Sequence, residues 1–440
     1  MKRGIGQKIS YASGSFSAAL LNQYIQSKAQ FFYIIEMKLS PIYYGLAIAI
    51  WAIWNSINDP LAGWYLDRHP TKWGRRLPWM KLFWLPLIIS FGLLWSPSPN
   101  WIGNNWLLFL WVLIVLLLFD TGYTVVILSW AALFPEIYTN SEDRNMVSGL
   151  RQLFSLFALV FALFIPPFFV KDGDILSYRF YGWVLASICF INLWLSFYGC
   201  KEPENTNLEN EYSLRDGLKI LKENKSYQAF LLANLVTYYS YGQVLAMLPF
   251  YRKFVLGFDE SFEKISYGGA IFLTLLSLFI WVWLTNRRDP KNTFIFSATW
   301  FSFILFILFF VKDNIMIIVL FSLCGIGLAG LLMVVDLLLA DIIDEDYLKT
   351  KKRREGIYFG INGFFIRLAI LLQAISLIVV SELTGFDKNK DIQSDLAQTG
   401  ILIQIFILPV VFFIVGIIIL KKFYYLEGDV LKEQRKQIQL

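Results

Sequence analysis

The sequence predicts an all-α membrane protein whose twelve transmembrane helices form two six-helix bundles. The 440 residues are 57% hydrophobic and only 16% charged, whereas about a quarter of the residues of a soluble protein are charged. Apolar segments long enough to cross a bilayer recur along the whole chain, and short basic turns separate many of them. The longest polar connection lies near the middle of the chain, which indicates two halves of equal size.

A helix that crosses the bilayer needs about 20 mostly apolar residues. On this criterion the expected spans are residues 9–36, 42–66, 78–97, 106–133, 145–170, 178–200, 228–251, 263–285, 293–311, 315–340, 356–383 and 399–420. The predicted division is an N-terminal bundle over residues 1–200, a cytoplasmic linker over 201–227, and a C-terminal bundle with a cytoplasmic tail over 228–440. Within the linker, the capping pattern at residues 213–216 predicts a short surface helix over residues 217–225.

Basic residues are concentrated in the turns on one side of these spans, including the turn of residues 72–76 and the tail from Lys421. The positive-inside rule therefore places both termini in the cytoplasm, which requires an even number of spans. We expect a multi-pass protein of the cell membrane whose surroundings are the lipid bilayer. The net charge of +6 lies in short turns, so it does not predict a nucleic-acid partner.

Residues that could carry chemistry are scarce. The three cysteines have no metal-ligand spacing and His69 is the single histidine, so we expect neither a disulfide framework nor a metal site. HExxH, GxSxG, paired CxxC and glycine-rich phosphate-loop motifs are absent from the sequence. These absences predict a protein that is not an enzyme and has no cofactor.

Charged residues inside the spans are functional candidates, because an ionised side chain is costly in lipid. Asp59, Asp120 and Arg151 lie at a similar expected depth, about 10 Å from the cytoplasmic ends of their helices. Asp336 and Arg367 form a comparable pair in the second half. The alternative for each residue is a structural ion pair that locks two helices together.

Two further groups of polar residues stand out. Asn22, Gln23, Gln26 and Gln30 follow helical spacing in the first span, which predicts one polar stripe facing a cavity. The acidic residues at the end of the tenth span, from Asp341 to Asp346, precede a basic run. This second cluster favours a cytoplasmic gate or a topology signal over a ligand site.

The region from Asn55 to Trp79 carries the most specific pattern. Its NDPLAG segment, followed by Asp67-Arg68 and WGRRLPW, resembles the span 2–3 signature of the glycoside-pentoside-hexuronide:cation symporters. DIID before RREG, and YYLEGD in the tail, are similar to other signatures of that family, so the resemblance covers nearly the whole chain. It implies the major facilitator superfamily fold, with a solute site between the halves and transport by alternating access.

The resemblance also implies roles for particular residues. Positions that hold four functional aspartates in melibiose permease correspond here to Ala19, Asn55, Asp59 and Ile127, so one of those carboxylates remains. Asn55 and Asp59 are the expected cation-coupling residues. The expected substrate-binding residues are Asn22, Gln26, Asp120, Tyr123, Arg151, Asn362 and Arg367. The expected gating residues are Asp67, Arg68, Arg75, Arg76 and Asp341.

A single carboxylate with Asn55 would form a weak cage for Na⁺, whereas a proton needs only one buried acid. The sequence therefore favours H⁺ over Na⁺ as the coupling cation, with uncoupled facilitation as the alternative. Two arginines facing one cavity would suit an anionic group on the substrate, unless Asp120 neutralises Arg151. The expected function is a monomeric secondary transporter of a small solute such as a sugar, glycoside or sugar acid. A lysolipid carrier and a non-transporting receptor or scaffold are the alternatives.

Overall fold

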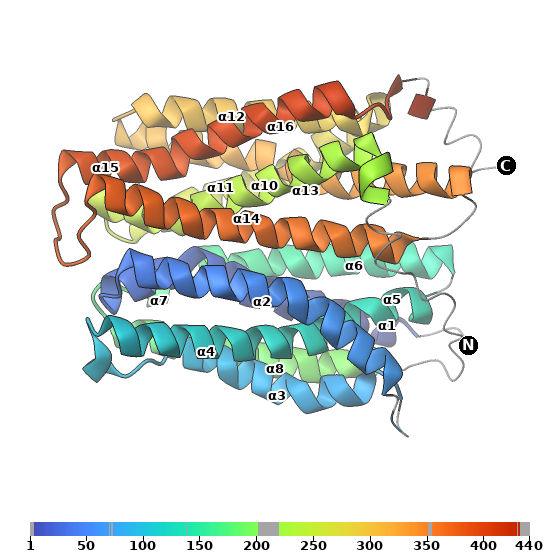
Figure 1. Cartoon of the computed structure of the whole chain (residues 1–440), viewed down its shortest axis with the longest axis horizontal. Helices are drawn as coiled ribbons and strands as arrows, with labels where there is room; N and C mark the ends of the chain where they lie inside the picture. Colours follow the sequence, from blue (N-terminus) through green and yellow to red (C-terminus); the bar gives the residue numbers. More distant parts are fainter. Residues whose placement is uncertain are drawn as a thin grey trace. The chain divides into compact units, whose positions relative to one another are not determined.

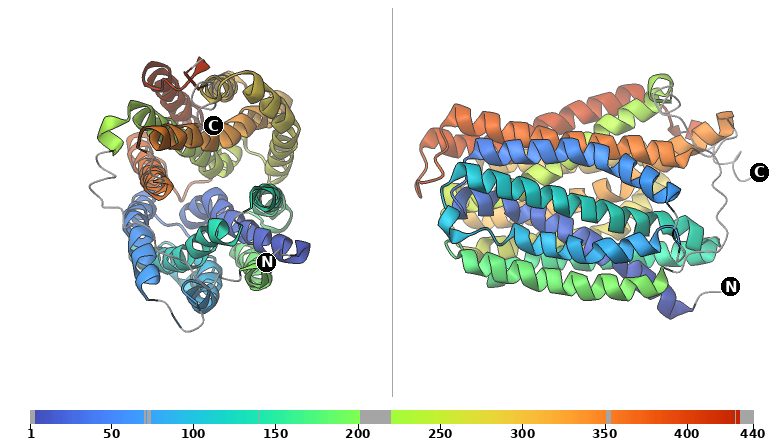
Figure 2. Two further views of the ribbon diagram at one scale, coloured as in Figure 1. Left: turned by 90° about the vertical axis from the view of Figure 1, so that its right-hand side faces the viewer. Right: turned by 60° about the horizontal axis from the view of Figure 1, so that its bottom comes forward.

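A computed structural model describes residues 4–69, 71, 74–138, 140–200, 220–350, 354–428 and 430–431. The chain divides into two compact units. The first contains Met1–Leu208 together with Asp387–Ile392, and the second contains Glu209–Phe386 together with Gln393–Leu440. Within each unit the helices run side by side as a bundle (Figures 1 and 2).

Several helices of the first unit continue through π-helical turns, labelled η, which follow the preceding helix without a break. The segments in order are α1 (Ile5–Tyr24), η1 (Ile25–Ala29), η2 (Phe32–Glu36), α2 (Pro41–Arg68), α3 (Leu77–Leu94), the 3₁₀ turn η3 (Pro99–Trp101), α4 (Asn105–Tyr123), η4 (Thr124–Leu128), α5 (Ser129–Ile137), α6 (Ser141–Leu159), η5 (Val160–Phe164), α7 (Pro166–Phe169), α8 (Ile175–Ser196) and the 3₁₀ turn η6 (Phe197–Gly199).

The second unit is built in the same way. Its segments are α10 (Lys225–Phe250), η7 (Tyr251–Leu256), α11 (Ser261–Arg287), α12 (Pro290–Phe310), α13 (Asn314–Thr350), α14 (Glu355–Thr384), α15 (Asp395–Leu402), η8 (Ile403–Ile407) and α16 (Leu408–Phe423). The predicted linker helix over residues 217–225 is described from residue 220 onward, and residues 220–223 are helical.

The prediction of an all-helical membrane protein is confirmed. In the described part of the chain, nine helical segments are long and apolar enough to cross a bilayer. The segments beginning at Ile5, Pro41 and Lys225 are also long but more polar, so the predicted count of twelve is consistent with the structure. Polar residues are tolerated in a transmembrane bundle when they face its interior.

The ends of the helices follow from local chemistry. Asn104, Asp174, Asn224 and Ser394 each accept a hydrogen bond from a backbone N–H in the first turn of the following helix. Prolines open α2, α3 and α12, where no hydrogen-bonded N–H is lost. Gly385, with φ of 65°, ends α14 in the left-handed conformation that glycine adopts most readily.

The two units share one packing pattern. In the first, α1 packs on α6 and α8, α4 packs on α2 and α3, and α3 packs on α8. In the second, α10 packs on α14 and α16, α13 packs on α11 and α12, and α12 packs on α16. Each contact in the first unit thus has a counterpart between the corresponding helices of the second. This is the arrangement expected of a structural repeat.

Candidate functional site

A buried carboxylate lies between α2 and α4. Asp120 of α4 is only 2% exposed. Its Oδ1 accepts a hydrogen bond of 2.6 Å from the side-chain amide of Asn55, and its Oδ2 accepts one of 3.1 Å from the amide of Asn58. Donors from α2 therefore reach both oxygens of Asp120, which reduces the cost of burying the carboxylate.

A second carboxylate belongs to the same network. The Thr124 hydroxyl donates to Asp59 Oδ1 at 2.7 Å and accepts from the Asn58 amide at 3.0 Å. Asn55, Asn58 and Asp59 occupy positions i, i+3 and i+4 of α2, so they share one helix face. Thr124 follows Asp120 by four residues and begins the π-helical turn η4. Such turns are frequent at functional sites.

We call Asn55, Asn58, Asp59, Asp120 and Thr124 the α2–α4 cluster. It contains two carboxylates, two amides and one hydroxyl. These groups offer oxygen ligands of the kind preferred by hard cations, and the carboxylates can also carry a proton. Among the described residues, no group of three or more His, Cys, Asp or Glu could hold a metal ion.

Arg151 of α6 lies against an aromatic surface. Its guanidinium carbon is 4.6 Å from the ring centroid of Trp130 and 4.9 Å from that of Phe134, both on α5. Trp130 stacks on Tyr11 of α1 at 5.2 Å, and each of these two side chains donates a hydrogen bond to the other's backbone carbonyl. Contacts among α1, α5 and α6 thus define the position of the Arg151 guanidinium, with favourable cation–π geometry.

The polar stripe of α1 is partly occupied by contacts within the first unit. The Tyr123 hydroxyl donates to the carbonyl of Ala18 at 3.1 Å, and the Asn22 amide lies 3.4 Å from the same oxygen. Gln26 is half-buried in the π-helical turn η1. The structure therefore brings the predicted residues Asn22 and Tyr123 together at one carbonyl.

In the second unit, polar side chains line the contact between α10 and α14. Asn234 of α10 donates to Asn362 of α14 at 2.6 Å. Arg367 lies one turn further along α14, where its Nη1 is 2.7 Å from the position of a Cβ added to Gly363. Gly363 thus leaves room for the guanidinium to lie along its own helix.

Arg367 has neighbours of two kinds. Asp336 of α13 and Arg367 are both within electrostatic range of Tyr238 on α10. Asp336 is exposed and Tyr238 is 40% exposed, so the group is open rather than sealed in the protein interior. An exposed carboxylate within a membrane span is expected to face water rather than hydrocarbon.

The charged residues of the two units correspond by position. Asp336 follows Asp120, and Arg367 follows Arg151, by the same number of residues. The two aspartates lie on corresponding helices, α4 and α13, and the two arginines lie on α6 and α14. Each half of the repeat therefore carries one acid and one arginine at equivalent places.

The predicted gating residues are only partly described. The side chains of Asp67 and Arg68 lie outside the described ones. Arg75 Nη2 pairs with Glu136 Oε1 of α5 at 2.5 Å. Arg76 is half-buried immediately before α3, and Asp341 is 5% exposed in the C-terminal part of α13. Glu136 is thus a partner of the basic turn that the sequence analysis did not identify.

Asn58 and Thr124 were also missing from the predicted site. Their spacing could have indicated them, because Asn58 lies one turn from Asn55 and Thr124 lies one turn from Asp120. Asp120, predicted among the substrate-binding residues, hydrogen-bonds to the predicted cation-coupling residue Asn55. The count of one carboxylate at that site, which came from the family resemblance, therefore leaves out Asp120.

Comparisons with known proteins are consistent over the whole chain. Residues 10–427 match the model of a family described as MFS/sugar transport protein. The sodium-dependent lysophosphatidylcholine symporter 1-A of Danio rerio is 20% identical, covering 99% of this chain and 88% of its own length. The isoprimeverose transporter of Lactiplantibacillus pentosus is 21% identical, covering 81% and 76%. A crystal structure of a D-xylose-proton symporter matches with a TM-score of 0.70 and 13% identity, covering 96% and 98%.

Proposed function

Because the chain belongs to the MFS/sugar transport protein family, we propose that it is a symporter whose coupling cation binds at the α2–α4 cluster. As a multi-pass transporter of this superfamily it moves a solute across a membrane by alternating access and is not an enzyme. The observation that carries the proposal is the hydrogen-bonded group of two carboxylates and three neutral side chains between α2 and α4.

The number of oxygen ligands in the α2–α4 cluster bears on which cation it binds. The sequence favours H⁺ because the family resemblance leaves Asp59 as the one carboxylate of the site. With Asp120 hydrogen-bonded to Asn55 and Asn58, two negative charges and several neutral oxygens are available, a set that suits Na⁺. We therefore propose Na⁺ as the coupling cation. The Danio rerio relative is sodium-dependent by its name, which agrees with this choice.

Measurement of cation binding tests the proposal directly. Purified protein should show a higher melting temperature in NaCl than in choline chloride at constant pH and ionic strength, because a cation that binds only the folded state stabilises it. Uptake into proteoliposomes should then follow an imposed Na⁺ gradient. Uptake that follows a pH gradient and ignores Na⁺ would instead support H⁺ coupling, and absence of counterflow for every substrate would favour the scaffold alternative.

The substrate is proposed to carry an anionic group that Arg151 and Arg367 recognise. Guanidinium groups form bidentate, charge-assisted hydrogen bonds with carboxylates and phosphates. A hexuronate would meet this requirement as a sugar acid. Asn22, Gln26, Tyr123 and Asn362 remain the proposed neutral contacts, and Asp120 is assigned to the cation instead.

A lysolipid is the second candidate substrate, and one observation favours it. Asp336 and Arg367 place a negative and a positive charge within electrostatic range of the aromatic ring of Tyr238. This combination suits a zwitterionic headgroup, whose phosphate would meet Arg367 and whose ammonium would meet Asp336 and the Tyr238 ring. A thermal-shift panel of a neutral disaccharide, a hexuronate and a lysophosphatidylcholine would distinguish the candidates.

Arg367→Ala is predicted to weaken substrate binding by roughly a hundredfold, since a charge-assisted contact of this kind contributes about 2–3 kcal/mol. Arg367→Lys should recover part of the loss, because it keeps the charge but not the planar pair of donors. Both effects can be measured by isothermal calorimetry with the strongest binder of the panel. Unchanged affinity in a folded Arg367→Ala protein would contradict the role.

The remaining assignments are also proposals. The basic side, with both termini, is assigned to the cytoplasm of a cell membrane, and the protein is assigned as a monomer of two six-helix bundles. The cytoplasmic gate is assigned to Asp67, Arg68, Arg75, Arg76 and Asp341.

Asp67→Ala is predicted to slow transport with little change in substrate affinity, because a gating residue controls the conformational change rather than the binding site. A large loss of substrate affinity in Asp67→Ala with normal turnover, measured by uptake kinetics, would argue against a gating role for Asp67.

A further inference from the structure

The residues that directly follow α16 pack against other helices of the second unit. The five residues that follow α16, Tyr424–Gly428, are here called the tail segment. Tyr424 and Leu426 are each 1% exposed, so alternate side chains of the segment are buried in the second unit. The Tyr424 hydroxyl donates to the carbonyl of Leu338 on α13 at 3.3 Å.

Polar contacts fasten the tail segment to two more helices. The backbone N–H of Tyr425 donates to Ser226 Oγ in the first turn of α10 at 3.1 Å. The backbone N–H of Gly428 donates to Asp289 Oδ2, just before α12, at 2.8 Å. Lys291 of α12 pairs with Glu427 at 2.9 Å. The segment thus crosses the basic-side ends of α10, α12 and α13.

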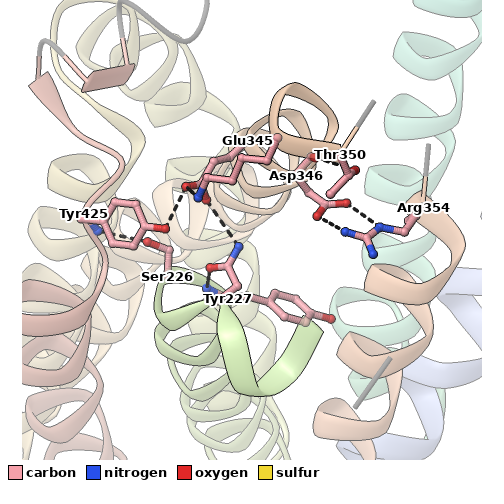
Figure 3. A network of polar contacts seen from close by, with 9 residues as sticks. Ser226, Tyr227, Glu345, Asp346, Thr350, Arg354 and Tyr425 are labelled. Carbon is pink, nitrogen blue, oxygen red and sulfur yellow. Dashed lines mark hydrogen bonds and ion pairs between the residues drawn. The ribbon is translucent and has the colours of Figure 1, made fainter. Parts of the chain in front are cut away.

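One buried carboxylate receives donors from three of these parts. Glu345 of α13 is 7% exposed. It accepts a hydrogen bond of 2.8 Å from the Tyr425 hydroxyl and one of 3.4 Å from the Asn224 amide (Figure 3). It also forms an ion pair with Lys349 on its own helix. Asn224 also caps α10 by accepting from the N–H of Tyr227 at 2.9 Å. Glu345 therefore connects the tail segment and the start of α10 to the C-terminal end of α13, which is here called its inner end.

The neighbouring acid connects a different helix. Asp346 accepts two hydrogen bonds from Arg354, which lies immediately before α14 (Figure 3). Consecutive residues on a helix point in different directions, so Glu345 and Asp346 can serve different partners. The sequence predicts a gate or a topology signal for this acidic run. The contacts of Glu345 with Tyr425 and of Asp346 with Arg354 both lie within the second unit.

The phenol of Tyr425 is suited to this contact. Burial, together with the hydrogen bond to the Glu345 carboxylate, raises the pKa of Tyr425 above its usual value. A phenol is protonated at neutral pH in any case, and the raised pKa only extends this range to higher pH, so Tyr425 remains a donor to Glu345. The carboxylate in turn needs such donors, because a buried charge without them is costly.

We propose that Glu345 is a positioning residue for the transport cycle, which holds the tail segment and the start of α10 to the inner end of α13 so that they move as one body. The proposal rests on the transport function given above. Alternating access is largely a rigid-body movement of one bundle. Without Glu345, the inner ends of these helices would move separately, and the movement of the bundle would reach them less efficiently.

The test compares Glu345→Ala, Glu345→Gln and Tyr425→Phe in the full-length protein with Tyr198→Phe, which removes a hydroxyl from a 69% exposed tyrosine. Hydrogen–deuterium exchange of residues 220–228 and 424–428 reports on the connection without any substrate. We expect exchange there to become about tenfold faster in Glu345→Ala and less so in Tyr425→Phe, because a hydrogen bond to a charged group is lost. Tyr198→Phe should leave it unchanged, and Glu345→Gln, which keeps an acceptor oxygen, should lie in between.

The transport readout separates positioning from binding. Counterflow in proteoliposomes should slow about tenfold in Glu345→Ala while the affinities for substrate and cation stay within about twofold. Combining Glu345→Ala with Tyr425→Phe should add little, since both remove the same contact. Unchanged exchange in Glu345→Ala and Tyr425→Phe would overturn the proposal, as would a loss of affinity equal to the loss of turnover. Because exchange needs no transport, an error in the proposed function would not be mistaken for an error in this one.

Discussion

Asp120→Asn is expected to weaken cation binding by roughly a hundredfold or more while the protein remains folded. A unit charge at about 4 Å contributes a few kcal/mol at the effective dielectric of a protein site, and each 1.4 kcal/mol corresponds to a factor of ten. Asparagine keeps the size of the side chain and one acceptor oxygen, and its NH2 group can donate to the oxygen of whichever of the Asn55 and Asn58 amides rotates, so the main loss is the charge. The melting temperature of Asp120→Asn should no longer respond to NaCl.

Two comparisons make this prediction specific. Asp59→Asn should produce a loss of the same size, because both carboxylates are proposed to face the cation. Asp395→Asn, an exposed position in the first turn of α15, should leave the Na⁺ response intact. If Asp59→Asn abolishes cation dependence but Asp120→Asn does not, the site has one working carboxylate, and H⁺ becomes the better assignment.

Glu263→Ala is expected to destabilise the second unit by about 3–5 kcal/mol, the usual cost of leaving one partner of a buried ion pair uncompensated. Glu263 of α11 is fully buried and Arg252 of η7 is 2% exposed; they pair at 2.7 Å. Arg252 also donates to the carbonyl of Phe258 at 2.8 Å, so it fixes the turn between η7 and α11. Unfolding of the detergent-solubilised protein would give the change in free energy.

Replacing both partners provides the control. Arg252→Met combined with Glu263→Leu should lose less stability than Glu263→Ala alone, because no unpaired charge stays buried. Asp387→Ala, which removes a much more exposed pair with Lys390 at 3.8 Å and a hydrogen bond of 3.0 Å from the N–H of Asn389, should cost only about 1 kcal/mol. Equal losses in Glu263→Ala and Asp387→Ala would mean that burial does not govern the strength of these pairs.

The helical framework follows from the sequence. Runs of apolar residues specify the spans, because backbone N–H and C=O groups in lipid must be satisfied within each helix. The motifs around Asn58-Asp59-Pro60 and Trp73-Gly74-Arg75-Arg76 were sufficient to indicate the transporter family, which the match over residues 10–427 establishes. The unusual cost of acids in the spans also marked Asp59 and Asp120 as functional candidates before any contact was known.

Tertiary structure alone decided which of these residues meet. Helical spacing places Asn55, Asn58 and Asp59 on one face of α2, and places Asp120 of α4 one turn before Thr124 of η4. It does not say that these two faces are opposed, since the residues of each contact are 62–66 positions apart in the chain. The same holds for Glu345, whose partner Tyr425 lies 80 residues away. Local sequence determines helices and their faces, whereas packing between distant segments determines the partners of a buried charge.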